Sequence, residues 1–293
     1  MKMKHLFTLI ICLIPLSVFS EKDWAWWNIL HGWETGMPSW RYFLIISPGY
    51  LGPNALPVPE VTKGIISDKK ELEFGSDYHF MKGDNAQDIS GRFYYPFAKG
   101  KIAVEISGIM VEHYSMSDKI RDKRIARDED GHGIAAGDLY FTTMIQLFKN
   151  RKFPDTMLRM SCKTASGGRL DAARYSDSPA YFFDLSFSRM MRGGKILPYG
   201  MLGFYSWQTN DDMNLQDDAF LYGAGFDICS GKMTVSNSVS GYYGYKGNGD
   251  RPFVYTFGLQ KKLKHNTIRL QYLHGIHDWM YRTVKISYIW NLD

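Results

Sequence analysis

The chain has 293 residues and a formal net charge of +5, with 45% hydrophobic, 15% aromatic and 22% charged residues. Without Lys2 and Lys4, which lie in the N-terminal segment discussed next, the 35 basic residues fall to 33, against 30 acidic ones. So small an excess gives no support for nucleic acid binding. Beyond the first 20 residues, no apolar run approaches the roughly 20 residues of a membrane-spanning helix, which excludes a helical membrane protein.

The chain opens with the features of a secretory signal peptide. A short basic start is followed by almost unbroken apolar sequence over residues 6–19 and by a small residue, Ser20. Cys12 lies inside this apolar run and not at its end, which argues against a lipoprotein anchor. We therefore expect residues 1–20 to be removed and the mature chain to begin near Glu21.

Residues 21–66 differ from the rest of the chain. Five of the eight tryptophans lie between Trp24 and Trp40, and an indole ring suits the interface between membrane and water. Four prolines between Pro48 and Pro59 then favour an extended path and exclude a regular central strand. Two interpretations remain open: a cap at the periplasmic rim, or a plug that folds into a barrel formed by residues 67–293.

From Lys69 onward, apolar and polar residues alternate with a period of two, which is the pattern of half-buried β-strands. In one such stretch, Phe183, Leu185 and Phe187 alternate with Asp184 and with serines. About twelve strands of this kind are predicted. They lie at residues 69–80, 89–97, 102–113, 136–149, 158–163, 183–188, 196–207, 219–229, 234–240, 253–259, 268–272 and 284–292.

The connections between these strands are alternately short and long. Short ones are predicted at residues 98–101, 150–155, 191–195, 230–231 and 263–266, and mostly longer ones at residues 114–135, 167–179, 208–218, 245–251 and 275–280. Outer-membrane barrels have short periplasmic turns, longer outside loops and strands of roughly 9–11 residues. The sequence therefore predicts an all-β fold, a closed antiparallel transmembrane β-barrel with both ends in the periplasm. A secreted β-sandwich is the alternative, but it has no reason to satisfy both patterns.

With these features the chain resembles the bacterial outer-membrane β-barrel proteins. The resemblance covers the signal peptide and residues 69–293, although the chain ends on Asp293 where that class frequently has an aromatic residue. Residues 137–140 (Gly-Asp-Leu-Tyr) and 163–168 (Lys-Thr-Ala-Ser-Gly-Gly) are similar to the barrels proposed to carry aromatic compounds and fatty acids. The resemblance implies the outer membrane of a Gram-negative bacterium, contact with lipid and lipopolysaccharide, and a porin-like role.

Charged side chains on the polar face of the strands are candidates for lining the lumen. Both signs occur in similar numbers, and the set comprises Glu71, Glu73, Asp77, His79, Arg92, Glu105, Arg159, Lys163, Asp184, Asp227, Arg269 and Lys285. Twelve strands enclose a narrow lumen, between the filled eight-stranded and the open sixteen-stranded case. We expect part of the set to brace the wall as ion pairs and the rest to line a narrow polar path. The alternative is a closed interior in which every charge is paired.

Three groups of side chains could bind metal ions. They are Asp128 with Asp130, the acidic residues Asp211, Asp212, Asp217 and Asp218, and His274 with His277 and Asp278. The first group lacks the third ligand and the terminal glutamate of a calcium loop. The second could share divalent cations with lipopolysaccharide phosphates, and nothing in the spacing of the third determines a geometry. We therefore predict no resident metal or cofactor.

Enzymatic activity is the weaker prediction. A lipid hydrolase needs a serine activated by a histidine, and the twelve-stranded outer-membrane phospholipase family carries a His-x-Ser-Asn-Gly motif that is absent here. His113 with Ser115 comes nearest to such a pair. We favour a channel or transporter for passive uptake of a small solute, which could be hydrophobic. A structural or surface-interaction barrel is the alternative, and a lipid hydrolase is the third.

Overall fold

The computed structural model describes residues 23–149, 152–191 and 193–292. The predicted signal peptide at residues 1–20 lies outside the described residues, as do residues 150–151 and 192 in two of the predicted turns. The chain divides into two compact units, one ending at Met37 and the other beginning at Pro38. In the described part of the chain, no helix is long and apolar enough to cross a membrane.

The first unit contains helix α2 (Ala25–His31), which ends where Gly32 adopts the left-handed conformation with a φ of 66°. The second unit opens with the 3-10 helix η1 (Trp40–Phe43). The rest of the second unit is dominated by β-strands.

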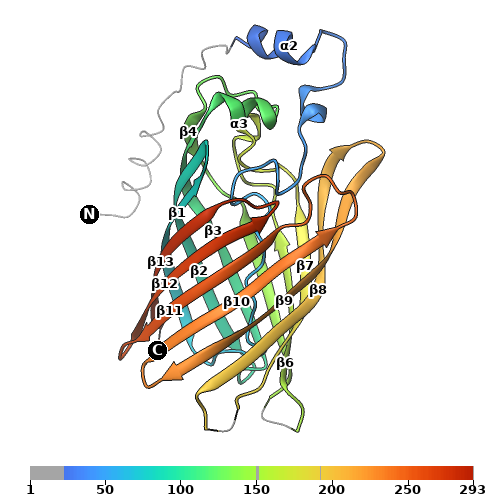
Figure 1. The fold of residues 1–293 in the computed structure, drawn as a ribbon. Helices are drawn as coiled ribbons and strands as arrows, with labels where there is room; N and C mark the ends of the chain where they lie inside the picture. Colours follow the sequence, from blue (N-terminus) through green and yellow to red (C-terminus); the bar gives the residue numbers. More distant parts are fainter. Residues whose placement is uncertain (1–22, 150–151, 192, 293) are drawn as a thin grey trace, which may run out of the picture. The chain divides into compact units, whose positions relative to one another are not determined.

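Twelve of the described strands form a closed antiparallel barrel (Figure 1). The first strand pairs with the last, with Lys70 opposite Leu292, and this pairing closes the sheet. The strands of the wall are β1 (Lys70–Met81), β2 (Asp84–Phe97), β3 (Ile102–Met116), β5 (Leu139–Phe148), β6 (Asp155–Lys163), β7 (Ala180–Ser188), β8 (Ile196–Asp211), β9 (Asn214–Ser230), β10 (Met233–Gly244), β11 (Phe253–Lys262), β12 (Asn266–His277) and β13 (Arg282–Leu292).

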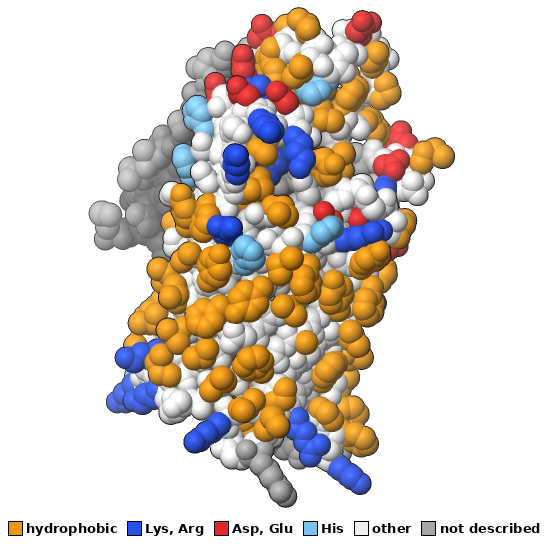
Figure 2. All heavy atoms as spheres, in the orientation of Figure 1, with side chains coloured by type: hydrophobic (Ala, Val, Ile, Leu, Met, Phe, Trp, Pro, Cys, Tyr) orange, Lys and Arg blue, Asp and Glu red, His pale blue; other side chains and the backbone are white. Residues whose placement is uncertain are grey.

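Alternation along each strand separates an apolar outer face from a polar inner face. On β7, Phe183 and Leu185 are each 45% exposed on the outside, whereas Asp184 and Ser186, which alternate with them, are fully buried. Figure 2 shows apolar side chains gathered on the visible face of the barrel wall, with Lys and Arg side chains below this band and side chains of both charges above it. Since a lipid bilayer solvates apolar but not charged side chains, this band is the lipid-facing surface.

The lipid-facing position of the apolar band can be tested by substitution. Leu202 lies in the interior of β8 and is 50% exposed, so Leu202→Arg should place a charge in the hydrocarbon and destabilise the barrel by about 2–4 kcal/mol. Met213 is 88% exposed at the turn after β8, so Met213→Arg is the matched control and should have little effect. Guanidinium unfolding of the refolded protein in lipid vesicles measures both. Equal losses would contradict a membrane position for the band.

The connections differ from the prediction at the end of the barrel with the long loops. Residues 208–218 were expected to form a loop, but β8 continues to Asp211 and β9 begins at Asn214, which leaves a two-residue turn. Similarly, β12 runs on to His277 into the predicted loop at residues 275–280. The prediction was wrong here because a hairpin that extends beyond the bilayer needs no apolar face, so its strands carry no alternating pattern.

The predicted loop at residues 114–135 contains regular structure as well. β3 continues to Met116, helix α3 (Asp118–Lys123) follows, and the short strand β4 (His132–Ala135) pairs with β3. Farther along the chain, the loop after β6 holds the 3-10 helix η2 (Leu170–Ala172). By the rule that long loops lie outside, this long-loop end is the extracellular end, and the short-turn end faces the periplasm.

Residues 44–69, which we call the inner segment, pass through the inside of the barrel (Figure 1). At the long-loop end, the carbonyl of Ile46 accepts a hydrogen bond from the Trp207 indole at 3.0 Å. Halfway along, the carbonyl of Glu60 accepts one from Arg159 on β6 at 3.1 Å. At the short-turn end, the Ile66 amide donates to Gln146 on β5 at 2.7 Å.

Prolines suit this path because they cannot donate to a strand ladder, and carbonyl groups of the inner segment instead accept hydrogen bonds from wall side chains, as at Ile46 and Glu60. Gly52 shows how closely it fits: a Cβ there would lie 2.8 Å from the carbonyl oxygen of Arg174. Glycine is required at such an approach.

Two apolar clusters contact the inner segment, one toward each end. The outer collar packs Ile46, Leu51 and Leu56 against aromatic residues of the wall, including Tyr205 and Trp207. The inner collar packs Ile66 against the wall residues Tyr94, Ala103, Met144 and Met157. Both clusters exclude water, and the space between them holds the candidate site.

Candidate functional site

A cavity of about 550 Å³ lies along the inner segment, and it adjoins a second cavity of about 260 Å³ with which it shares lining residues. The larger cavity reaches from the outer-collar side of the inner segment, at Asn54, to Ser67 near the periplasmic end. Its lining carries acidic and basic side chains from strands on opposite sides of the barrel. The cavity is the part of the polar barrel interior that the inner segment does not fill.

Arg92 on β2 is the centre of one cluster of ion pairs in the lining. Its guanidinium contacts Glu71 at 2.6 Å, Glu73 at 2.8 Å and Glu105 at 3.1 Å. Arg269 on β12 pairs with Glu73 from the other side. β13 lies between β12 and β1, so the cluster connects strands across the inner face of the wall from β12 to β3.

Other pairs join the inner segment to the wall. Lys63 forms an ion pair with Asp227 on β9, and the Glu60 side chain accepts a hydrogen bond from Gln271 on β12 at 3.3 Å. The Thr62 hydroxyl contacts that of Ser186 on β7. These three contacts anchor consecutive parts of the inner segment to different sides of the barrel.

The structure brings most of the predicted lumen residues together. Eight of them line the larger cavity: Glu71, Glu73, Asp77, Arg92, Glu105, Arg159, Arg269 and Lys285. His79 lines the smaller cavity. The remaining three are buried in ion pairs: Lys163 with Asp138, Asp184 with Arg159, and Asp227 with Lys63.

A buried polar network closes the long-loop end of this space. Arg174, fully buried in the loop after β6, donates to Glu112 at 2.8 Å and to Asp84 at 2.8 Å. Although burial lowers the pKa of Arg174, the carboxylates of Glu112 and Asp84 raise it well above its usual value, so this guanidinium stays charged. Arg124 beside α3 contacts Asp84 at 2.7 Å. The network fastens two outer loops to the inner face of β2 and β3.

Asn54 connects this network to the inner segment. Its amide nitrogen donates to Glu112 at 2.7 Å and to Asp88 at 2.8 Å. Sequence reasoning missed Asn54, Asp88 and Arg174, because loop positions carry no periodic signal and residues 81–88 were not assigned to a strand. The alternation of Asp84, Ala86 and Asp88 was a usable sign that β2 begins earlier.

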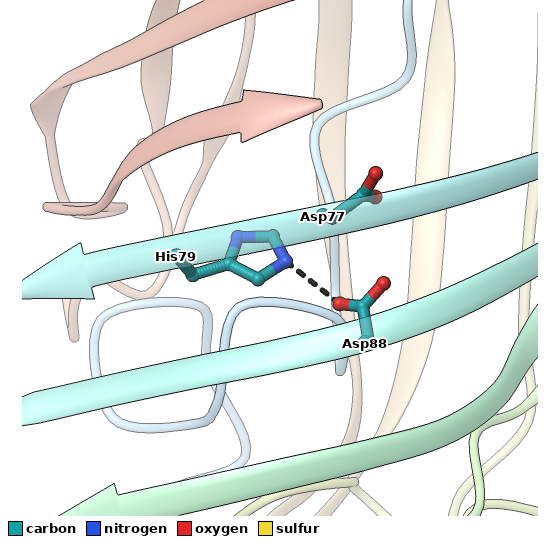
Figure 3. Close-up of side chains that lie close together, drawn as sticks. All are labelled: Asp77, His79 and Asp88. Atoms are coloured by element: carbon teal, nitrogen blue, oxygen red, sulfur yellow. Dashed lines mark hydrogen bonds and ion pairs between the residues drawn. The ribbon is translucent and has the colours of Figure 1, made fainter. Parts of the chain in front are cut away.

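Asp77, His79 and Asp88 form a compact group beside Asn54 (Figure 3). Asp77 and His79 lie two residues apart on β1, and Asp88 lies directly opposite Asp77 on β2. His79 Nε2 is 2.8 Å from Asp88 Oδ2, and His79 Nδ1 is 2.7 Å from the hydroxyl of Thr283. All three side chains of the group are buried.

The side chains predicted as metal or catalytic candidates lie elsewhere. Asp128 accepts hydrogen bonds from Tyr114 at 2.9 Å and Arg169 at 2.7 Å, while Asp211 pairs with Lys246 at 2.7 Å. His277 is exposed and contacts Asp278 at 3.2 Å. His113 and Ser115 are both exposed on the outward side of β3.

No known family model matches the chain, and no curated protein matches it. Among solved structures, an outer membrane channel from Pseudomonas putida F1 is similar with a TM-score of 0.55 and 12% identity, over 82% of this chain and 97% of that one. The KdgM porin is similar with a TM-score of 0.48 and 8% identity, over 75% of this chain and 99% of that one. The toluene transporter TodX of Pseudomonas putida reaches 0.38 and 7%, over 83% and 95%.

At this level of identity, the similarity to the channel from Pseudomonas putida F1 concerns the fold. It agrees with the closed barrel of twelve antiparallel strands and with the apolar band on its outer surface. The chain is thus an outer-membrane β-barrel, and it resides in the outer membrane of a Gram-negative bacterium.

Proposed function

We propose that this protein is a passive outer-membrane channel for a small polar solute and that the inner segment closes it. The observation that supports this proposal is the cavity of about 550 Å³, which follows the inner segment between the two apolar collars and is lined by acidic and basic side chains. Side chains can fill the interior of an eight-stranded barrel, whereas a wider barrel leaves space beside them. Charged walls that remain beside open space favour a path for water and solute.

The lining also bears on the kind of solute. Acidic residues such as Glu71 and Glu105 alternate around the cavity with basic ones such as Arg92 and Lys285, and most are paired. A wall of nearly balanced charge favours neutral or zwitterionic polar solutes over strongly charged ones. The apolar region under the outer loops is occupied by Leu51 and Leu56, which makes a hydrophobic solute the weaker proposal. Membrane lipid and lipopolysaccharide are the partners we propose for the outer surface.

In this proposal, solute passes when the inner segment shifts, and a cross-link should prevent that shift. The γ atoms of Thr62 and Ser186 are in contact, so T62C/S186C should form a disulfide between the inner segment and β7. Cys162 and Cys229 are free and would be replaced by serine in the background. In planar bilayers, we expect conductance steps of the background protein to disappear on oxidation and to return on reduction.

The single variant T62C is the matched control, since it alters the same hydroxyl contact but cannot form the cross-link. It should behave alike under oxidising and reducing conditions. If the cross-linked protein conducts as often as the reduced one, the inner segment does not gate the lumen.

A further inference from the structure

We propose that Asp77, His79 and Asp88 form a binding site for one divalent transition-metal ion inside the lumen. One ligand atom from each of the three side chains lies within 4.8 Å of the other two, which is a distance that one ion can bridge with small side-chain rotations. The site goes beyond the proposed function, because it stands on these contacts whether or not the barrel conducts.

The charge balance of the group calls for a cation. Asp88 is 3% exposed, and no lysine or arginine among the described residues pairs with it. Its hydrogen bonds come from His79 and from the neutral amide of Asn54. Asp77 has a cationic neighbour, since Lys285 lies 3.2 Å away. A buried carboxylate without a positive partner is costly, and a bound metal ion would supply the missing charge.

Donor atoms for the ion are present and free. Asp77 Oδ1 and Asp88 Oδ1 are both buried, and neither has a hydrogen-bond partner within the described parts of the chain. Buried oxygens of this kind are normally satisfied, so two of them beside one imidazole point to a ligand. Figure 3 shows the two carboxyl groups projecting from neighbouring strands next to the ring of His79.

The position of His79 is also that of a metal ligand. Once an ion occupies Nε2, the proton of the neutral ring lies on Nδ1, which then donates to the Thr283 hydroxyl 2.7 Å away. A hydrogen bond to the ring nitrogen that does not bind the metal holds a ligating histidine in orientation. Trp279 and Tyr281 pack edgewise on the ring, with centroids 6.4 Å and 6.1 Å away, and restrict it further.

One imidazole nitrogen with two carboxylates favours Zn²⁺ and related ions over Ca²⁺ or Mg²⁺, which prefer oxygen ligands throughout. An ion could reach the group from the lumen, because the smaller cavity is lined by Asp77 and His79. Asn54 of the inner segment shares Asp88 with the site. The Asp88 carboxylate would therefore both bind the metal ion and anchor the inner segment.

Co²⁺ is a suitable probe, since its visible absorption reports its ligands. Titration of the full mature chain, refolded in detergent, should show one saturable site per barrel. Binding should be tighter at higher pH, because protons compete with the ion for its ligand atoms. The variants H79Q and D88N should each weaken binding at least about tenfold. H113Q changes an exposed histidine on the outward side of β3 and should bind as the parent does.

Electrophoretic mobility before and after heating checks that each variant is folded. If H79Q and D88N fail to fold, the parent protein alone tests the proposal, because X-ray absorption of bound Co²⁺ must show the outer-shell scattering of one imidazole ring, which marks a histidine nitrogen among mainly oxygen ligands. The proposal is overturned if Co²⁺ does not saturate, if H79Q binds as tightly as the parent, or if no nitrogen ligand is seen. None of these readouts involves conductance, so failure of the metal site and failure of the channel are separate results.

Discussion

Deletion of residues 21–64 should convert the barrel into a steadily conducting pore. These residues include most of the inner segment, with the contacts of Asn54, Thr62 and Lys63 to the wall. Their removal would leave one continuous lumen that extends from the outer collar through the cavity to the inner collar. We expect steady single-channel conductance at least about tenfold above that of the full mature chain, in keeping with a twelve-stranded wall. Planar-bilayer recording of refolded protein measures it.

The matched control is deletion of residues 21–37, which removes only the first compact unit. It leaves the inner segment and both collars in place, so its conductance should equal that of the full mature chain. If the longer deletion folds and inserts but stays silent, then wall side chains such as Arg92 and Glu105 close the lumen by themselves. That outcome would favour a structural barrel.

Arg174→Ala should cost about 3–5 kcal/mol of stability, which is the range for breaking a buried ion pair by removing one partner. Arg174 is fully buried, and its loss leaves Glu112 without its guanidinium partner and Asp84 with only that of Arg124. Guanidinium unfolding in lipid vesicles measures the loss. The expected result includes earlier proteolysis of the loop after β6, because Arg174 fastens that loop.

Arg41→Ala is the control for the removal of an arginine as such. The Arg41–Asp177 pair has a similar distance, 2.9 Å, but its side chains are 53% and 36% exposed. Exposed pairs contribute about 0–1 kcal/mol, so this variant should remain close to the parent. If Arg174→Ala lost as little stability as Arg41→Ala, the buried network would be solvated and would not hold the outer loops.

The barrel itself could be predicted from the sequence because the bilayer imposes a regular pattern on it. Phe183, Asp184 and Leu185 show why: side chains on one strand alternate between lipid and lumen, and the contrast in polarity is visible without any partner. The prediction of a closed antiparallel barrel of about twelve strands was confirmed, and most strand bounds differ by only a few residues. The same pattern selected nine of the charged residues that border the cavities, but not Glu60, Lys63 and Asp138, which border them as well.

The remainder depends on contacts that leave no pattern in the sequence. Asn54 meets Asp88 and Glu112, which lie 34 and 58 residues farther along the chain, and nothing near Asn54 indicates either partner. Asp88 itself fell in the stretch between two predicted strands. The proline content predicted an extended path for residues 48–59, but the chain turns at residues 48–50 and 53–55, where the amides of Tyr50 and Ala55 donate to carbonyls three residues earlier. Proline fixes a local φ, and not the path of its neighbours or a position inside or outside a wall.

The course of the inner segment constrains the order of assembly. Residues 44–52 lie at the extracellular end, where Ile46 meets Trp207, and the same segment leaves the periplasmic end to begin β1 at Lys70. Since the wall is complete only when β1 pairs with β13, a wall that closes first would require the free end to be pulled through its full length. In the more direct route, the inner segment packs against the growing sheet, and β1 and β13 pair around it last. The barrel then closes with the inner segment already inside.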